Sequence, residues 1–216
     1  MGKVETNKAN KRSSLLEHAY DLFINKGFND TTISDIVKKS NVAKGTFYLY
    51  FKDKYDLRDQ LVARESAKVL IAAQDEIDRL PEEKKPREFE GYVHLLIEYV
   101  LNHFVQNKMQ LRFISKNLSW GVFQHVMTEN APTIRHSDEA VTDLNQFYRR
   151  YLEALSLGNY KCDRPDLLLF TIIELVGSTA YSAIINEVPC TIEEYKPYLF
   201  RSIHQIFEGY KVDAAQ

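Results

Sequence analysis

The chain contains 216 residues, 44% of them hydrophobic and 27% charged, and its formal net charge is −2. This length and composition support a sizeable core and exclude a globally disordered chain. Two cysteines are too few for a disulfide framework, and the polar, basic first residues lack the apolar run of a secretory signal, so we expect a cytoplasmic protein.

The charge is distributed unevenly along the chain. Residues 1–60 hold 11 Lys and Arg against 8 Asp and Glu, whereas residues 61–216 hold 17 against 22. The asymmetry is mild. A basic N-terminal part, residues 1–60, followed by an acidic remainder favours a polyanion as the partner of the N-terminal part.

Helical periodicity dominates the N-terminal part. Residues 13–26 carry apolar side chains at helical spacing, and Gly27 ends this segment. A second, short helix is expected to begin at Thr32 and to end at Asn41, because asparagine tolerates the left-handed conformation of a tight turn. The stretch AKGTFYLYF, residues 43–51, is the third helix. Two short helices joined by a tight turn are a helix-turn-helix, whose second helix can enter the major groove of DNA.

The third helix has a packing side. Phe47, Tyr50 and Phe51 lie at i, i+3 and i+4, so they project within about a third of a turn of one another. We expect Phe47 and Phe51 to pack against the first helix.

The other faces of this helix offer polar groups to a partner. Lys44 supplies charge, Gly45 leaves the backbone open to a phosphate, and the hydroxyls of Thr46 and Tyr48 can reach phosphates or base edges. The alternative is that all the rings are core and the lysine is a solvated surface charge. Spacing alone leaves both interpretations open.

The stretch TTISDIVKKSNVAKGTFYLYFKDKYDL, residues 31–57, resembles the DNA-binding signature of the TetR family of transcriptional regulators. The resemblance covers about residues 10–60 and rests on the run Gly-Thr-Phe-Tyr-x-Tyr-Phe followed by Lys-x-x-Leu. Asn41 stands where the family usually has glycine, and Val37 and Ser40 stand where it usually has alanine. Asparagine is compatible with the turn.

The resemblance implies a pseudo-palindromic double-stranded DNA operator, a homodimer and a small-molecule effector. It also assigns roles to single residues: Thr32 would contact phosphate, Tyr50 would touch the DNA backbone, and Lys54 would hold a phosphate. The DNA-binding residues that we predict are Thr32, Lys44, Gly45, Thr46, Tyr48, Tyr50 and Lys54.

Longer helical patterns follow the motif. They cover about residues 54–80, 87–105, 109–128, 137–157, 165–186 and 191–210. Residues 167–185 have about the length of a transmembrane span, but Glu174 at their centre makes a buried helix the better interpretation, so we expect no membrane partner. The sequence thus predicts an all-α fold of about nine helices, with a helix-turn-helix domain at 8–60 and a larger helical domain for effector binding and dimerisation at 61–216.

The larger domain holds 18 aromatic residues, which indicate either an ordinary core or a mostly apolar effector cavity with a few polar groups. Glu174 is a counter-charge for a cationic ligand in one interpretation and a partner of Arg149 or Arg150 in the other. The predicted pocket residues are Tyr92, Tyr99, His103, Phe113, Trp120, Phe123, Phe147, Tyr151 and Glu174.

The last two helices combine small residues with an apolar stripe, which favours an interface between two copies of the chain. The resemblance implies a dimeric four-helix bundle at the same place. The predicted interface residues are Gly177, Ala180, Ile184, Leu199, Ile203 and Ile206.

Catalysis finds little support in the sequence. There are no paired Glu-x-x-His motifs, no Gly-rich phosphate loop, no nucleophile elbow and no Cys-x-x-Cys, so we expect no metal, no cofactor and no enzyme. We predict a DNA-binding regulator, most simply a repressor released by a small, largely hydrophobic effector. The alternatives are a regulator controlled by a protein partner without a small ligand and, behind it, a helical metal- or cofactor-binding enzyme.

Overall fold

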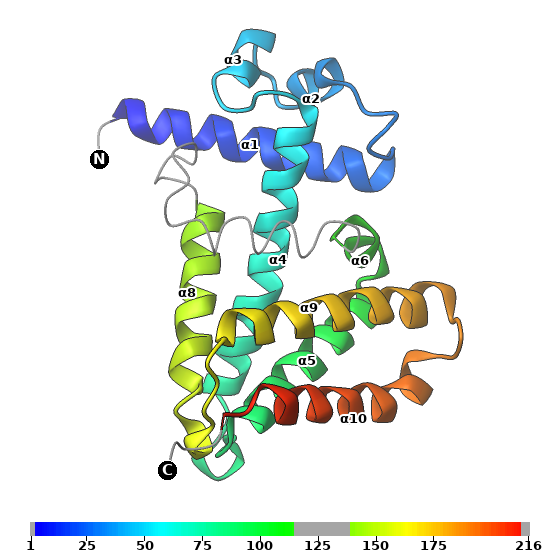
Figure 1. Cartoon of the computed structure of the whole chain (residues 1–216). Coiled ribbons are helices and arrows are strands. Elements are labelled where there is room, and N and C mark those ends of the chain that lie inside the picture. Colours follow the sequence, from blue (N-terminus) through cyan, green and yellow to red (C-terminus); the bar gives the residue numbers. More distant parts are fainter. Residues whose placement is uncertain (1–2, 115–138, 213–216) are drawn as a thin grey trace. The chain divides into compact units, whose positions relative to one another are not determined.

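The computed structural model of the protein describes residues 3–114 and 139–212 (Figure 1). In these ranges the regular elements are helices, as the sequence predicts, and a single antiparallel bridge joins Cys162 to Lys211. The helices are α1 (Lys3–Asn25), α2 (Ile33–Lys39), α3 (Lys44–Tyr48), α4 (Lys54–Asp78), η1 (Glu82–Lys84), α5 (Phe89–Gln106), α6 (Lys108–Ile114), α8 (Glu139–Ala154), η2 (Leu157–Asn159), α9 (Pro165–Tyr181), the π-helical η3 (Ser182–Asn186) and α10 (Ile192–Tyr210).

The chain divides into two compact units, Met1–Val62 and Ala63–Gln216. The first unit contains α1, α2, α3 and the beginning of α4, and the second contains the remainder of α4 and all later helices. Each unit has its own buried apolar residues and is described separately below.

The first unit is built on the apolar side of α1. Its buried side chains come from α1, α2, the α3 segment and the beginning of α4, and α2 packs against both α1 and α3. The residues with the least exposure are Leu15, Leu16, Ala19, Phe23, Ile36, Val37, Phe47, Phe51, Leu57 and Leu61. Phe47 and Phe51, predicted to pack against the first helix, are buried in this core, and the guanidinium of Arg12 in α1 lies 5.7 Å from the centroid of the Phe51 ring.

A tight turn joins α2 to α3. The Ser40 amide donates to the Ile36 carbonyl at 2.9 Å, and the Val42 amide donates to the Val37 carbonyl at 3.0 Å. Asn41 between them has φ 53°, which confirms the left-handed turn expected of this asparagine. Two short helices and this turn form a helix-turn-helix.

The second unit packs α5, α8, α9 and α10 around one core with the later part of α4. Phe89 lies near its centre, with ring centroids 5.3 Å from Tyr151, 5.3 Å from Tyr160 and 5.6 Å from Phe207. The apolar run beginning at Pro165 is long enough to cross a membrane by length and composition, but five residues of α9 are buried in this core. We therefore describe α9 as a core helix.

The helix expected at about 109–128 corresponds to α6 (Lys108–Ile114) within the described residues, and residues 115–128 lie outside them. The helix expected at about 54–80 ends at Asp78.

Candidate nucleic-acid interface and ligand cavity

α3 separates its side chains into a buried side and an exposed side. Phe47 is fully buried and Phe51 is 1% exposed, whereas Tyr48 and Leu49 are 54% and 67% exposed. Lys44 is also exposed and has no ion-pair partner among the described residues. The exposure of Tyr48 excludes the alternative in which every ring of this stretch belongs to the core.

Gly45 lies on the same exposed side. A Cβ atom added there would meet no other atom within 4 Å, so packing inside the protein does not require a glycine at this position. Thr46 and Tyr50 are half-buried, so they present only part of their surface to a partner.

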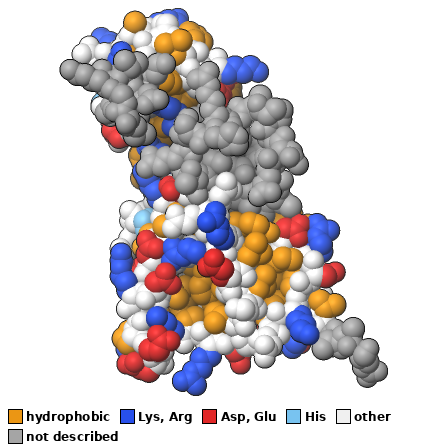
Figure 2. Space-filling model, turned by 90° about the vertical axis from the view of Figure 1, so that its left-hand side faces the viewer, with side chains coloured by type: hydrophobic (Ala, Val, Ile, Leu, Met, Phe, Trp, Pro, Cys, Tyr) orange, Lys and Arg blue, Asp and Glu red, His pale blue; other side chains and the backbone are white. Residues whose placement is uncertain are grey.

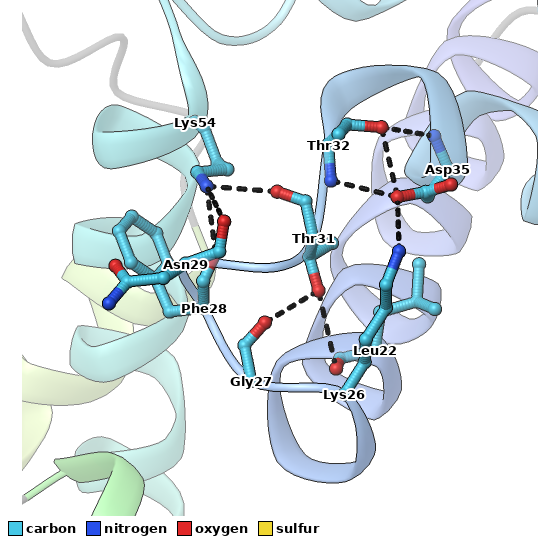
Figure 3. Close-up of polar contacts among 9 residues, drawn as sticks. All are labelled: Leu22, Lys26, Gly27, Phe28, Asn29, Thr31, Thr32, Asp35 and Lys54. Atoms are coloured by element: carbon cyan, nitrogen blue, oxygen red, sulfur yellow. Dashed lines mark hydrogen bonds and ion pairs between the residues drawn. The ribbon is translucent and has the colours of Figure 1, made fainter.

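Thr32 and Asp35 form a capping box at the start of α2 (Figure 3). The Asp35 amide donates to Thr32 Oγ1 at 3.1 Å, while the Thr32 amide and hydroxyl both donate to Asp35 Oδ2 at 2.9 Å. Lys26 Nζ lies 2.8 Å from the same oxygen. The Thr32 hydroxyl, predicted to contact phosphate, therefore already donates its proton within the protein.

Lys54 forms hydrogen bonds within the protein. Its Nζ donates to the carbonyl oxygens of Phe28 at 2.7 Å, Thr31 at 2.9 Å and Asn29 at 3.4 Å (Figure 3). An ammonium group has three donors, and all three are directed at backbone oxygens of the loop between α1 and α2. A phosphate held by Lys54, as predicted, would have to replace at least one of these bonds.

A cavity of about 70 Å³ lies inside the second unit. Among the described residues, those that line it are aliphatic or aromatic apart from Gly177. They come from α4, α5, α6, α8 and α9: Leu70, Val93, Leu96, Ile97, Val100, Phe104, Leu111, Ile114, Phe147, Tyr151, Leu169, Ile172, Ile173, Val176, Gly177 and Ala180.

Two of the predicted pocket residues, Phe147 and Tyr151, line this cavity. The Tyr151 hydroxyl donates to the Pro165 carbonyl at 3.1 Å, and burial raises the pKa of Tyr151 far above its usual value. The only hydroxyl on the described lining is therefore already bonded within the protein. Trp120 and Phe123 lie outside the described residues.

The other predicted pocket residues lie elsewhere. The Tyr92 hydroxyl accepts from Gln74 Nε2 at 2.8 Å, and burial raises the pKa of Tyr92 to about 12. Tyr99 stacks on His103, with ring centroids 6.4 Å apart. Phe113 is half-buried beside the core without lining the cavity.

Neither predicted role of Glu174 has a supporting contact among the described residues. It is exposed rather than directed into the cavity. It also does not pair with Arg150, which instead forms ion pairs with Asp75 at 2.8 Å and Asp78 at 2.6 Å.

The predicted interface residues are largely internal. Ala180, Ile184, Leu199 and Ile203 are at most 2% exposed in the single chain, and Gly177 lines the cavity. Of this set, Ile206 retains partial exposure beside the core. The stripe on α10 therefore packs inside its own chain, and an interface on these helices has to use their other side.

Residues 15–61 match the family model for bacterial regulatory proteins of the tetR family. The uncharacterized HTH-type transcriptional regulator YvdT of Bacillus subtilis is 48% identical over 44 residues, which are 20% of this chain and 23% of that protein. The HTH-type transcriptional regulator YhgD of the same organism, also uncharacterized, is 23% identical over 167 residues, which are 76% of this chain and 80% of that protein. A further relative, the uncharacterized HTH-type transcriptional regulator YxbF of the same organism, is 24% identical over 165 residues, which are 71% of this chain and 41% of that protein. The matches therefore span less than half the length of YvdT and of YxbF.

The fold is shared with solved proteins over nearly the whole chain. A TetR-family transcription regulator from Marinobacter aquaeolei has a TM-score of 0.55 at 16% identity, covering 97% of this chain and 100% of that one. A TetR-family chain from Syntrophomonas wolfei has a TM-score of 0.58 at 20% identity, covering 94% and 98%.

The geometry of α2, the turn and α3 defines the class of protein, a helix-turn-helix protein with a separate helical unit. The match over residues 15–61 identifies the family: the chain belongs to the TetR family of transcriptional regulators, and its fold agrees over both units.

Proposed function

We propose that the protein is a cytoplasmic repressor that binds a pseudo-palindromic operator as a homodimer and is released by a small apolar effector. The observation that carries the DNA-binding part is the exposed side of α3, which offers Lys44, Gly45, Tyr48 and Leu49 above a buried Phe47. A short helix whose inner side is packed and whose outer side is exposed is what entry into a major groove requires.

Each exposed group on α3 suits a different part of the DNA. The Lys44 ammonium suits a phosphate or the acceptors of guanine, and the Tyr48 hydroxyl suits a phosphate oxygen or a base edge. The open space at Gly45 lets the backbone approach a phosphate closely. Leu49, the most exposed of the apolar side chains, suits the methyl group of thymine.

We propose that the homodimer forms through the outer faces of α9 and α10. Leu167 and Phe170 of α9 are 37% and 42% exposed, and Tyr198 of α10 is 61% exposed. α9 and α10 pack against each other, so these exposed residues lie on adjacent helices. Figure 2 shows hydrophobic side chains gathered on the visible face of the second unit. Exposed large apolar side chains on two adjacent helices favour a second copy of the chain as their cover.

The cavity supports a neutral, apolar effector. Because the carboxylate of Glu174 is outside it and the Tyr151 hydroxyl is occupied, the described lining offers neither a counter-charge nor an unused hydrogen-bond donor. Its volume of about 70 Å³ is roughly half that of an engineered cavity that admits benzene. A ligand would therefore have to bind an expanded conformation, and preference for such a conformation is what lets an effector change DNA affinity.

Selection of bound duplexes from a random DNA pool tests this function. We expect enrichment of one sequence that contains two inverted half-sites separated by one or more helical turns. Enrichment of a single site without an inverted repeat would contradict binding as a homodimer. The absence of any enriched sequence would contradict the proposal that the protein is a DNA-binding regulator.

A further inference from the structure

A glutamine with an unpaired oxygen is buried in the core of the second unit. Gln74, on α4, is fully buried. Its Nε2 donates to the Tyr92 hydroxyl at 2.8 Å and to the Phe147 carbonyl at 3.1 Å, whereas its Oε1 has no hydrogen-bond partner. The Phe147 carbonyl fixes this orientation of the amide, because the opposite one would place two carbonyl oxygens against each other. The oxygen is therefore the atom that remains unpaired.

The Tyr92 hydroxyl beside it also has an unused hydrogen-bonding capacity. It accepts from Gln74, and among the described residues no acceptor takes its own proton. The two side chains thus offer one acceptor and one donor. Because the acceptor belongs to the amide to which this hydroxyl is bonded, a single oxygen atom of a ligand can reach both. Buried polar groups in native proteins are nearly always paired, so an unpaired one calls for an occupant.

These polar groups lie at one end of the cavity. Gln74 is one helical turn after Leu70, the α4 residue on the described lining, and Tyr92 directly precedes Val93, the first α5 residue on that lining. Phe147, whose carbonyl accepts from Gln74, lines the cavity itself. Residues four apart on a helix share a face, so the apolar wall formed by Leu70 continues to Gln74. An expansion of the cavity by one turn, about 5 Å, in this direction would reach the unpaired oxygen.

We propose that Gln74 and Tyr92 form the polar end of the effector site, and that the effector is a neutral alcohol or phenol with an apolar body. This proposal rests on the function proposed above and names the chemical class of its effector. The hydroxyl of the effector donates to Gln74 Oε1 and accepts from the Tyr92 hydroxyl, and its apolar body occupies the cavity.

The surroundings of Gln74 favour a neutral hydroxyl over a charged group. An ionised carboxylate has no proton to donate to Oε1. A cation would be buried without a counter-charge, because Asp75 and Asp78, the carboxylates that follow Gln74 on α4, are ion-paired with Arg150 at 2.8 Å and 2.6 Å. A hydroxyl both donates and accepts through one atom, which matches the acceptor and the donor that the site offers.

Two probes of equal size test the site. 4-Ethylphenol and 4-ethyltoluene have the same number of non-hydrogen atoms and differ only in a hydroxyl or a methyl group on the ring. Calorimetry measures the dissociation constants of both for the wild type, Gln74→Met, Tyr92→Phe and Tyr160→Phe. Gln74→Met replaces the amide by an apolar group of similar length. Tyr160→Phe is the matched control for Tyr92→Phe, because it removes a hydroxyl of the same core that donates to the Phe207 carbonyl at 2.7 Å.

We expect the wild type to bind 4-ethylphenol about tenfold more tightly than 4-ethyltoluene, because the hydroxyl of the probe pairs with groups that folding has already removed from water. This preference should disappear in Gln74→Met, decrease in Tyr92→Phe and persist in Tyr160→Phe, while the affinity for 4-ethyltoluene stays nearly constant. If Gln74→Met does not fold, the comparison of Tyr92→Phe with Tyr160→Phe decides.

Several results would overturn the proposal. They are a wild type that binds neither probe or both equally, a Gln74→Met variant that keeps the preference, and a variant that loses affinity for both probes alike. A crystal structure with 4-ethylphenol gives a further readout. A probe hydroxyl within hydrogen-bond distance of Gln74 Oε1 supports the proposal, whereas an ordered water that holds this oxygen while the probe is bound contradicts it.

These measurements need no DNA, so they separate this proposal from the proposed function. A wild type that selects an operator but does not distinguish the probes would overturn the polar site and leave the regulator. A wild type that prefers 4-ethylphenol but enriches no DNA sequence would support a ligand site at Gln74 and contradict its role as the effector site of a regulator.

Discussion

Asp35 shows at the scale of one residue how the start of α2 is held. Its carboxylate accepts from Lys26 Nζ and from both the amide and the hydroxyl of Thr32. The Lys26 ammonium and then the bonds from Thr32 hold the pKa of the Asp35 carboxyl well below its usual range. The folded state therefore favours the ionised carboxylate more than the unfolded state does.

The expected consequence is a pH-dependent stability. A carboxyl whose pKa is lowered by folding stabilises the protein above its unfolded pKa of about 4, and this contribution is lost as the pH falls below that value. At pH 7 the wild type should therefore melt at a higher temperature than Asp35→Asn, and the difference should shrink as the pH falls from about 4 towards 2. Melting curves of both proteins across this range measure it. Asp30→Asn, in an exposed residue of the preceding loop, is the control, and a difference that does not vary with pH would contradict the assignment.

Single residues also mark where sequence reasoning succeeds. The separation of Phe47 from Tyr48 followed from helical spacing, and the left-handed Asn41 followed from residue type, because both depend on local geometry. The partners of Lys54 could not be predicted in this way, since its three carbonyls lie 23 to 26 residues earlier in the chain. A family-based role for a lysine does not reveal which internal oxygens it meets.

At the scale of the helix, local signals located α10 closely. The sequence predicts 191–210 and the structure has Ile192–Tyr210, where a capping box between Thr191 and Glu194 fixes the start. The same signals could not decide which side of the last two helices faces a partner. α9 is apolar on most of its circumference, so its composition did not show that Glu174 lies on the exposed side. The stripe containing Leu199 and Ile203 proved to be the internal one.

The corrected interface gives a prediction for α9 and α10. Replacing an exposed apolar residue there with a charge should separate the two copies, because the charge would be buried without a partner. We expect Leu167→Glu combined with Tyr198→Glu to shift the sedimenting species from twice the chain mass of 25.2 kDa to one chain mass. Val212→Glu, an exposed apolar residue beyond the end of α10, is the matched control. A double variant that still sediments as a dimer would place the interface elsewhere.

At the scale of the whole molecule, the sequence predicted two helical units, and the structure divides after Val62. It could not predict whether the rings of the second unit enclose a space, because a cavity depends on packing between helices that are distant in sequence. The described lining unites Leu70 of α4 with Phe147 of α8 and Ala180 of α9. Of the predicted aromatic residues, Phe147 and Tyr151 line this space, whereas Tyr92, Tyr99 and Phe113 pack in or beside the core.

The cavity predicts how the protein responds to apolar ligands. Ala180→Leu adds three carbon atoms at the cavity wall, so it should abolish the rise in melting temperature caused by an apolar ligand found in a screen of the wild type. Ala183→Leu, at a buried alanine that does not line the cavity, should be destabilised by a similar overpacking and keep the ligand response. If both variants respond like the wild type, the ligand binds elsewhere. If no apolar compound shifts the melting temperature of the wild type, control by a protein partner is favoured.

The central claim is that the exposed side of α3 reads DNA. The most direct test compares the affinity for the selected operator with that for a scrambled duplex at one salt concentration, in the wild type and in Lys44→Ala and Tyr48→Ala. Both side chains are exposed, so both variants should keep the wild-type melting temperature and helicity. We predict that each loses at least about tenfold in the ratio of the two affinities, the size expected for one lost specific contact. Unchanged ratios in both variants would contradict the account.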